Sequence, residues 1–339
     1  MRGTGGWMNP LIGLAVFAVA AMTMPSSAAP VSPQSLANVT LAIGDPITQK
    51  ALELSGEIDH LPFKVQWANI SGGPQTIEAF RAHALDLGAV ADIPAIHATW
   101  TGLPVKIVAV QFRQDPIHHA VYGLGIAPGA NINKLADLRG KKIAYSPGQA
   151  QGALVLRILQ KAGLRKQDVT LVELPSTGDV YPNAIASRLV DAAPIGRAAA
   201  LRYLRNYGRD GAKVIDHGLR DDPLYLYAPV SVLQDPAKAA AIRVYVEAWA
   251  RAYRWIHLHP DAWVAGYYVK QQGLSPEDGH KLVIGAGNPD VPANWNDAIA
   301  RQQQTIDLLA KETGKPRLNA AELFDRRFEN VAAHAIATK

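Results

Sequence analysis

The chain has 339 residues, of which 48% are hydrophobic and 19% charged, a composition that suits one large or two medium globular domains rather than a disordered chain. Its formal net charge of +5 is spread thinly, without the basic stripe that nucleic-acid binding requires. The sequence contains no cysteine, which excludes disulfides, thiolate-bound zinc, iron–sulfur clusters, a lipoprotein anchor and a cysteine nucleophile.

The N-terminal segment has the layout of a secretory signal. Between Arg2 and Asp45 there is no charged residue, and residues 11–24 are almost wholly apolar before a stretch of Pro, Ser and Ala. This run is shorter than the ~20 residues needed to span a membrane. We predict a cleavable signal peptide at residues 1–28, cut after Ala28, and therefore a mature protein in the periplasm. An uncleaved anchor helix is the alternative, and Met8 is a second candidate for the true start.

Alternating strand and helix patterns begin after residue 38. Strands are predicted at residues 39–43, 63–70, 85–91 and 105–110, and helices follow the first three of them. The pattern restarts after residue 118, with strands at residues 121–126, 142–145, 169–174, 192–195, 213–215 and 226–232 and helices at residues 150–162, 181–187 and 198–207. From residue 236 onward the chain is predicted to be helical. Short connections between strands and helices indicate two α/β units with largely parallel sheets.

Four turns that precede predicted helices suggest where a ligand binds. They contain Asp45-Pro46, Gly73-Pro74, Asp92-Ile93 and Gly148-Gln149. The N–H groups at a helix start have no partner within the helix and carry a partial positive charge of about +0.5, so they attract anions. Ligands of open α/β sheets bind outside the carboxyl ends of the strands. We therefore expect an anion in a cleft between the two α/β units.

Two segments resemble the aliphatic-sulfonate, taurine and nitrate branch of the periplasmic solute-binding proteins. The first runs from Gly73-Pro74-Gln75 to the segment DLGAVADIP at residues 86–94, which is the most specific part of the resemblance. The second is LADLRGKKIA at residues 135–144, which is similar to the family's entry into its second lobe and is shared by many binding proteins of this type. The resemblance covers roughly residues 38–310 in the family's order and spacing.

The resemblance implies both a fold and a role. The fold is α/β, a type II periplasmic binding protein with two lobes, two crossover strands and a C-terminal helical segment. Lobe one would comprise residues 38–118 plus 219–339 and lobe two residues 119–218. Such a protein captures an aliphatic or taurine-like sulfonate in the interlobe cleft by hinge closure. It would act as a monomer without a cofactor and pass the ligand to the transmembrane subunits of an ABC import permease.

Site residues are carried over from the family position by position. The resemblance implies ligand contacts at Asp45, Pro46, Gly73, Pro74, Gln75, Asp92, Ile93, Gly148, Gln149 and Ala150, to which we add Arg197.

Three positions depart from the family's pattern. Gln149 stands in a turn where hydroxyl side chains are usual, and Asp45 stands where an uncharged amide is common. Arg197 follows Ile195-Gly196, where relatives commonly have Trp-Asp/Glu-Pro, and its guanidinium could bind a sulfonate, carboxylate or phosphate through two hydrogen bonds. Asp45 and Arg197 together would suit a zwitterion or a hydroxyl-bearing anion. The alternatives are a helix cap for Asp45 and a salt bridge for Arg197.

Other residues give little sign of catalysis or of a metal site. The histidines have no carboxylate partner at zinc-site spacing, so we expect no metal. No nucleophile-elbow pentapeptide is present. A desulfinase with a similar scaffold attacks with cysteine, which this chain lacks, and a pyrimidine synthase of thiamine biosynthesis relies on histidine and iron inside the cell. The sequence therefore predicts a binding protein and not an enzyme, with nitrate, a carboxylate or a thiamine-pathway pyrimidine as alternative ligands.

The aromatic residues of the helical tail recur near helical spacing, which favours packing in the core. On this ground we assign Trp249, Tyr253, Trp255, Trp263, Tyr267 and Tyr268 to the core. Tyr181, Tyr225 and Tyr227 are the better candidates for contact with a ligand, since they fall near the expected cleft.

Overall fold

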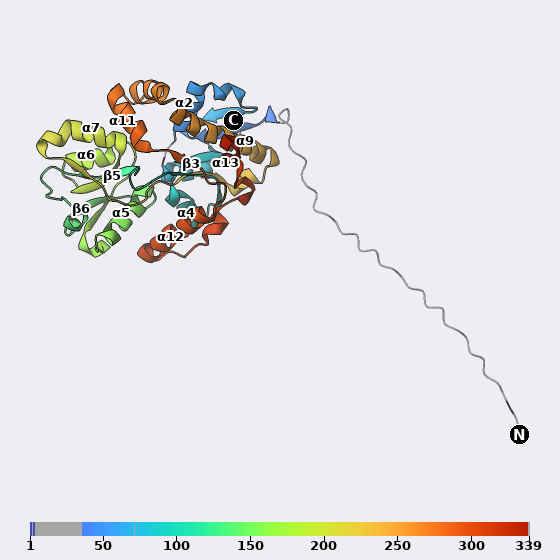
Figure 1. Ribbon diagram of the computed structural model, residues 1–339. Helices are drawn as coiled ribbons and strands as arrows, with labels where there is room; N and C mark the ends of the chain where they lie inside the picture. Colours follow the sequence, from blue (N-terminus) through green and yellow to red (C-terminus); the bar gives the residue numbers. More distant parts are fainter. Residues whose placement is uncertain (2, 4–35, 71, 338–339) are drawn as a thin grey trace. The chain divides into compact units, whose positions relative to one another are not determined.

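Two β-sheets, each covered by helices, organise the chain (Figure 1). The computed structural model describes residues 36–70 and 72–337, together with Met1 and Gly3. Apart from these two residues, the expected signal peptide at residues 1–28 and its cleavage site lie outside the described residues. Within the described part of the chain, no helix has the length and apolar character that crossing a membrane would require.

The first sheet has six strands in the order β11-β4-β10-β3-β1-β2. Their bounds are β1 (Thr40–Gly44), β2 (Lys64–Trp67), β3 (Leu87–Val90), β4 (Val105–Arg113), β10 (Leu224–Pro229) and β11 (Pro289–Asp290). Strand β1 pairs in parallel with β2 and β3, whereas β10 is antiparallel to both β3 and β4.

The second sheet has five strands in the order β7-β6-β8-β5-β9. Their bounds are β5 (Tyr122–Ile126), β6 (Lys142–Tyr145), β7 (Thr170–Glu173), β8 (Ala192–Gly196) and β9 (Lys213–Ile215). The expectation of largely parallel sheets is wrong, because both sheets are mixed. Strands β10 and β5 each enter their sheet from a segment that arrives from the other sheet, and each runs antiparallel to its neighbours.

The helices fall close to their predicted positions. Their bounds are α2 (Pro46–Ser55), α3 (Gly73–Arg81), α4 (Asp92–Trp100), α5 (Ala150–Lys161), α6 (Val180–Ala186), α7 (Arg197–Tyr207), α8 (Val230–Leu233), α9 (Pro236–Leu258), α10 (Pro260–Trp263), α11 (Pro276–Ala286), α12 (Asn296–Thr313) and α13 (Val331–Ala337). A π-helix, η5 (Val264–Val269), continues α10. Short 3₁₀ turns are η1 (Glu57–His60), η2 (Leu135–Leu138), η3 (Lys166–Asp168), η4 (Gly208–Asp210), η6 (Ala320–Leu323) and η7 (Arg326–Phe328).

Each sheet has its own hydrophobic core. In Figure 1 the green segments, with α6 and α7, surround the second sheet, while the blue segments and α12 and α13 in red lie around the first. Helix α5 belongs to both cores, because Leu156 packs with the first and Leu159 with the second. The strands of the second sheet all lie within residues 122–215. The lobe boundaries expected from the sequence stay a prediction.

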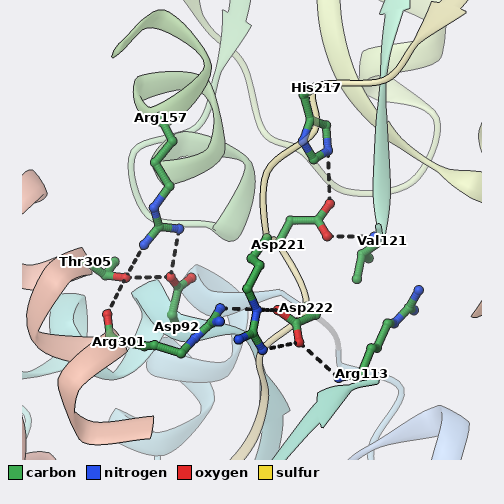
Figure 2. A network of polar contacts seen from close by, with 10 residues as sticks. Asp92, Arg113, Val121, Arg157, His217, Asp221, Asp222, Arg301 and Thr305 are labelled. Atoms are coloured by element: carbon green, nitrogen blue, oxygen red, sulfur yellow. Dashed lines mark hydrogen bonds and ion pairs between the residues drawn. The ribbon is translucent and has the colours of Figure 1, made fainter. Parts of the chain in front are cut away.

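Residues 114–121 and 216–223 connect the two sheets, and side chains tie these two segments together (Figure 2). The carboxylate of Asp221 accepts hydrogen bonds from the backbone N–H groups of Val121 at 2.7 Å and Tyr122 at 2.8 Å. His217 accepts from the N–H of Leu219 through Nδ1, so Nε2 carries the proton that faces the carbonyl oxygen of Tyr122 at 3.1 Å. Asp221 and His217 are both buried.

A second carboxylate, Asp222, lies beside the first and is held by three arginines. It accepts from the backbone N–H of Arg113 at 3.0 Å and from the guanidiniums of Arg220 and Arg301 at 2.9 and 3.2 Å. Burial alone would raise the pKa of Asp222, but the hydrogen bonds from Arg220 and Arg113 and the charge of Arg301 outweigh it and lower this pKa. Asp222 therefore stays ionised and fixes α12 to the connecting segment.

We expect Asp221→Ala to lower the free energy of unfolding by about 3 kcal/mol, because each buried N–H that loses its partner costs ~1–3 kcal/mol. Urea unfolding of the parent and the variant measures this difference. Asp221→Asn keeps one acceptor oxygen and should lose less. The exposed Asp210 provides the control Asp210→Ala, which should leave stability unchanged. Equal losses in the two alanine variants would contradict the role assigned to Asp221.

Candidate ligand-binding site

A cavity of about 480 Å³ lies between the two sheets. Residues from both sheets and their helices line it. Ile47 of α2 and Arg113 of β4 come from the side of the first sheet. Gln151 of α5 and Arg197 of α7 come from the side of the second sheet. This volume falls within the ~300–1,000 Å³ that is usual for pockets that hold small organic ligands. Val121 of the connecting segment 114–121 also lines it, so the cavity adjoins the segments that join the sheets.

The cavity wall is positively charged. Three arginines line it, Arg113, Arg197 and Arg202, and no Asp or Glu side chain is among the described residues that form it. Arg202 lies 3.4 Å from the carboxylate of Asp179, and both side chains are partly exposed, so this pair stands at the rim. The charge inside the cavity therefore comes from Arg113 and Arg197.

Arg113 and Arg197 converge on the same stretch of backbone. Arg113 donates from Nη1 to the carbonyl oxygens of His119 at 2.7 Å and Ala120 at 3.5 Å, and Arg197 donates from Nε to the carbonyl oxygen of Ala120. Burial lowers the pKa of Arg113; the charge of Arg197 lowers it further, and the carboxylates of Asp221 and Asp222 oppose this. A guanidinium has five N–H donors, so both arginines retain donors for an anion.

The local structure explains why Arg197 points into the cavity. Strand β8 ends at Gly196, and Arg197 is the first residue of α7, an 11-residue helix. Its side chain therefore leaves the chain at the carboxyl end of a strand, where ligands of α/β sheets bind. The unpaired N–H groups of the same helix start add to the positive potential.

The rest of the wall is aromatic, aliphatic and amide. Its aromatic part consists of Tyr253, Trp263, Tyr267 and Tyr268. Gln111 of β4 is 7% exposed, and its side-chain oxygen has no hydrogen-bond partner among the described residues. Since buried polar atoms are nearly always paired, this amide is available to a ligand.

Among the predicted site residues, only Arg197 lines this cavity. Asp45 is 2% exposed and caps α2, where it accepts from the N–H of Thr48 at 3.2 Å and from the hydroxyl of Tyr245 at 3.2 Å. Burial raises the pKa of Asp45 to about 6, against the lowering effect of the bonds from Thr48 and Tyr245. Pro46 follows as the first residue of the helix.

Asp92 and Ile93 begin α4 and are both buried. The carboxylate of Asp92 accepts from the hydroxyl of Thr305 on α12 at 2.9 Å and lies 3.4 Å from the guanidinium of Arg157 on α5 (Figure 2). Asp92 therefore links helices from the two sides of the molecule and does not face the cavity.

The remaining residues that were predicted to bind the ligand lie next to one another. A Cβ added to Gly73 would lie 2.8 Å from the carbonyl oxygen of Gly148, so the start of α3 touches the turn before α5. Pro74, Gln75, Gly148 and Gln149 line a separate groove, and Ala150 begins α5. Contact of these residues with a ligand, like that of Asp45, Pro46, Asp92 and Ile93, stays a prediction.

The core assignment of the tail aromatics is confirmed for Trp249 and Trp263, which are 0% and 3% exposed in the first core. Tyr225 and Tyr227 are 1% and 0% exposed within the first sheet, and Tyr181 is 3% exposed in the second core, so none of the three lines the cavity. Four of the residues assigned to the core, Tyr253, Trp263, Tyr267 and Tyr268, line the cavity as well as packing in or against the core. One signal was present in the sequence, because the adjacent pair Tyr267-Tyr268 cannot place both rings on one face of a regular helix.

The chain matches the model of the family described as NMT1/THI5 like over residues 64–263, which is more than half of its length. It belongs to this family. It is 30% identical over 159 residues to the putative aliphatic sulfonates-binding protein of Escherichia coli (strain K12), a match that spans 47% of this chain and 46% of that protein. The chain thus spans about half the length of the curated relatives it matches.

Solved structures show the fold. The alkanesulfonate-binding protein SsuA of Xanthomonas axonopodis pv. citri, bound to MOPS, superposes with a TM-score of 0.69 at 20% identity, covering 85% of this chain and 98% of that one. The C27S mutant of DSZB in complex with biphenyl-2-sulfinic acid gives a TM-score of 0.59 at 16% identity, covering 88% and 99%. The fold is that of a periplasmic binding protein, as the sequence predicted.

We expect Asp45→Asn to stabilise the protein at high pH. The pKa of Asp45 is about 6 in the folded state and 3.8 in the reference state, so ionisation on going from pH 4 to pH 8 costs the folded protein stability. The neutral amide avoids this cost, which amounts to as much as about 3 kcal/mol at ~1.36 kcal/mol per pKa unit. Urea unfolding at pH 4, 6 and 8 should show a gain at pH 8 that disappears at pH 4.

The exposed cap of α9 gives a matched control. Asp235 accepts from the N–H groups of Ala237 and Lys238, as Asp45 does from Thr48, but lies in solvent. Asp235→Asn should show no gain at pH 8. A pH dependence that is identical in the two variants would contradict the burial cost assigned to Asp45.

Proposed function

We propose that the chain is an extracytoplasmic solute-binding protein that captures an organic sulfonate in the cavity between its sheets and passes it to an ABC import permease. The names of its relatives support the ligand class, since one is called an aliphatic sulfonates-binding protein and another an alkanesulfonate-binding protein. The periplasmic location and the permease partner are supported by the names of two solved structures, one called a periplasmic aliphatic sulphonate binding protein and the other a periplasmic protein of a sulfonate ABC transporter.

The observation that carries the proposal is the pair Arg113 and Arg197 in a cavity that no Asp or Glu lines within the part of the chain that the structure describes. A sulfonate is ionised at every pH at which the protein folds, and it presents three oxygens that accept hydrogen bonds. Guanidinium groups bind such oxyanions through short, charge-assisted hydrogen bonds. In a partly buried cavity, these bonds are screened less than at the surface.

The residues that line the cavity are suited to binding an anion without a chemical reaction. The solved desulfurization enzyme carries a cysteine that its mutant replaces, and the present chain has no cysteine anywhere. A cysteine-dependent reaction on a sulfur oxyanion is therefore not open to this chain. Arginine, amide and aromatic side chains are sufficient to hold an anion in place.

We expect Arg197→Ala to weaken sulfonate binding about 10- to 150-fold, because a hydrogen bond to a charged group contributes ~1.5–3 kcal/mol. Arg197→Lys keeps the positive charge but lacks the paired N–H donors of a guanidinium. Its loss of affinity should therefore be smaller than that of Arg197→Ala. Arg209 is an exposed arginine outside the cavity, and Arg209→Ala should bind as the parent does. Isothermal titration with ethanesulfonate, taurine, nitrate and acetate measures these affinities.

The same titrations separate the alternatives. If nitrate or acetate binds more tightly than the sulfonates, that anion is the ligand, and the proposed anion site still stands. Absence of binding by every anion would contradict the proposal, as would equal affinities for the parent and Arg197→Ala.

A further inference from the structure

Aromatic side chains line the cavity together with its arginines. Tyr253 comes from α9, Trp263 from α10, and Tyr267 and Tyr268 from the π-helix η5. The rings of Trp263 and Tyr267 stack with centroids 4.4 Å apart and planes 14° apart. The ring of Tyr268 stands edge-on to both, at 6.3 Å from Trp263 and 5.1 Å from Tyr267.

This aromatic wall is held in place by packing. Trp263 is 3% exposed, so its ring position is fixed by the core. A Cβ added to Gly279 of α11 would lie 2.7 Å from a methyl group of Val264 and 3.2 Å from the Cβ of Tyr268. The missing side chain therefore lets α11 pack directly against η5. A rigid wall of rings loses little conformational entropy when a ligand binds.

The π-helix explains why both neighbouring tyrosines reach the cavity. Its wider turn departs from the spacing of an α-helix, and such turns are rare and often occur at functional sites. Tyr267 and Tyr268 are half-buried, as expected for rings that form a wall rather than a core.

We propose that the preferred ligand is an aromatic sulfonate, with the sulfonate on Arg113 and Arg197 and the ring against Trp263, Tyr267 and Tyr268. This inference rests on the proposed function, and it narrows the ligand from organic sulfonates to those that carry a ring. A sulfonate group withdraws electron density from the ring to which it is attached. Electron-poor rings stack well on the electron-rich faces of Tyr and Trp, in addition to the area that they bury.

The direct test compares a matched pair of probes by isothermal titration. Benzenesulfonate and cyclohexanesulfonate have the same charged group and the same number of carbons, and they differ in aromaticity. We expect benzenesulfonate to bind roughly two- to twelvefold more tightly, the ratio that corresponds to one aromatic pair. Naphthalene-2-sulfonate should bind more tightly still, and the neutral naphthalene-2-sulfonamide should bind at least tenfold more weakly than the sulfonate.

A substitution tests whether the aromatic side chains of the cavity cause the preference for benzenesulfonate. Tyr268→Leu should bring the ratio between the affinities for the two probes close to one. Tyr207 on α7 is also half-buried but outside the cavity, so Tyr207→Leu should retain the ratio. Circular dichroism of both variants establishes that they fold.

The outcomes distinguish this inference from the proposed function. Equal affinities of the parent for benzenesulfonate and cyclohexanesulfonate would overturn the inference and leave sulfonate binding intact. Binding of ethanesulfonate or taurine without binding of either ring-bearing probe would do the same. Failure of every sulfonate to bind would overturn both.

Discussion

The backbone of residues 119–122 passes between the two sheets, and its polar groups are paired with side chains. The N–H groups of Val121 and Tyr122 donate to Asp221, and the carbonyl of Tyr122 faces His217. Because an unpaired buried N–H or carbonyl is costly, this connection is stable only while those side chains stay in position. The relative position of the two sheets depends on this pairing.

The cavity uses part of the same arrangement. The carbonyls of His119 and Ala120 accept hydrogen bonds from Arg113 and Arg197, and these two side chains also supply the positive charge of the cavity. Arg113 is further fixed through its own backbone N–H, which donates to Asp222. Arg113 and Arg197 therefore both hold the connecting segment and line the cavity. This explains how two guanidiniums, which repel one another, can be kept together in a partly buried place.

The sequence predicted the fold better than the site. Strands such as β1 and β6 and helices such as α5 and α7 follow strong local periodicity, so they fall close to their predicted bounds. Arg197 could be found because it departs from a family pattern. Arg113 was missed, since it ends an apolar strand and nothing near it in the chain shows that it meets Arg197. The lining of the cavity by Tyr253, Trp263, Tyr267 and Tyr268 was not predicted, because a hydrophobic pattern does not distinguish a face that packs in a core from a face that lines a cavity.

Two glycines set how closely the two halves of the chain approach beside the turn before α5. Gly73 approaches the backbone of Gly148, and the ring of Pro74 lies beside the same glycine. A Cβ at position 73 would lie 2.8 Å from the carbonyl oxygen of Gly148, which is closer than side chains normally come to backbone. Any residue larger than glycine at position 73 would therefore push the start of α3 away from this turn and widen the spacing between the two halves.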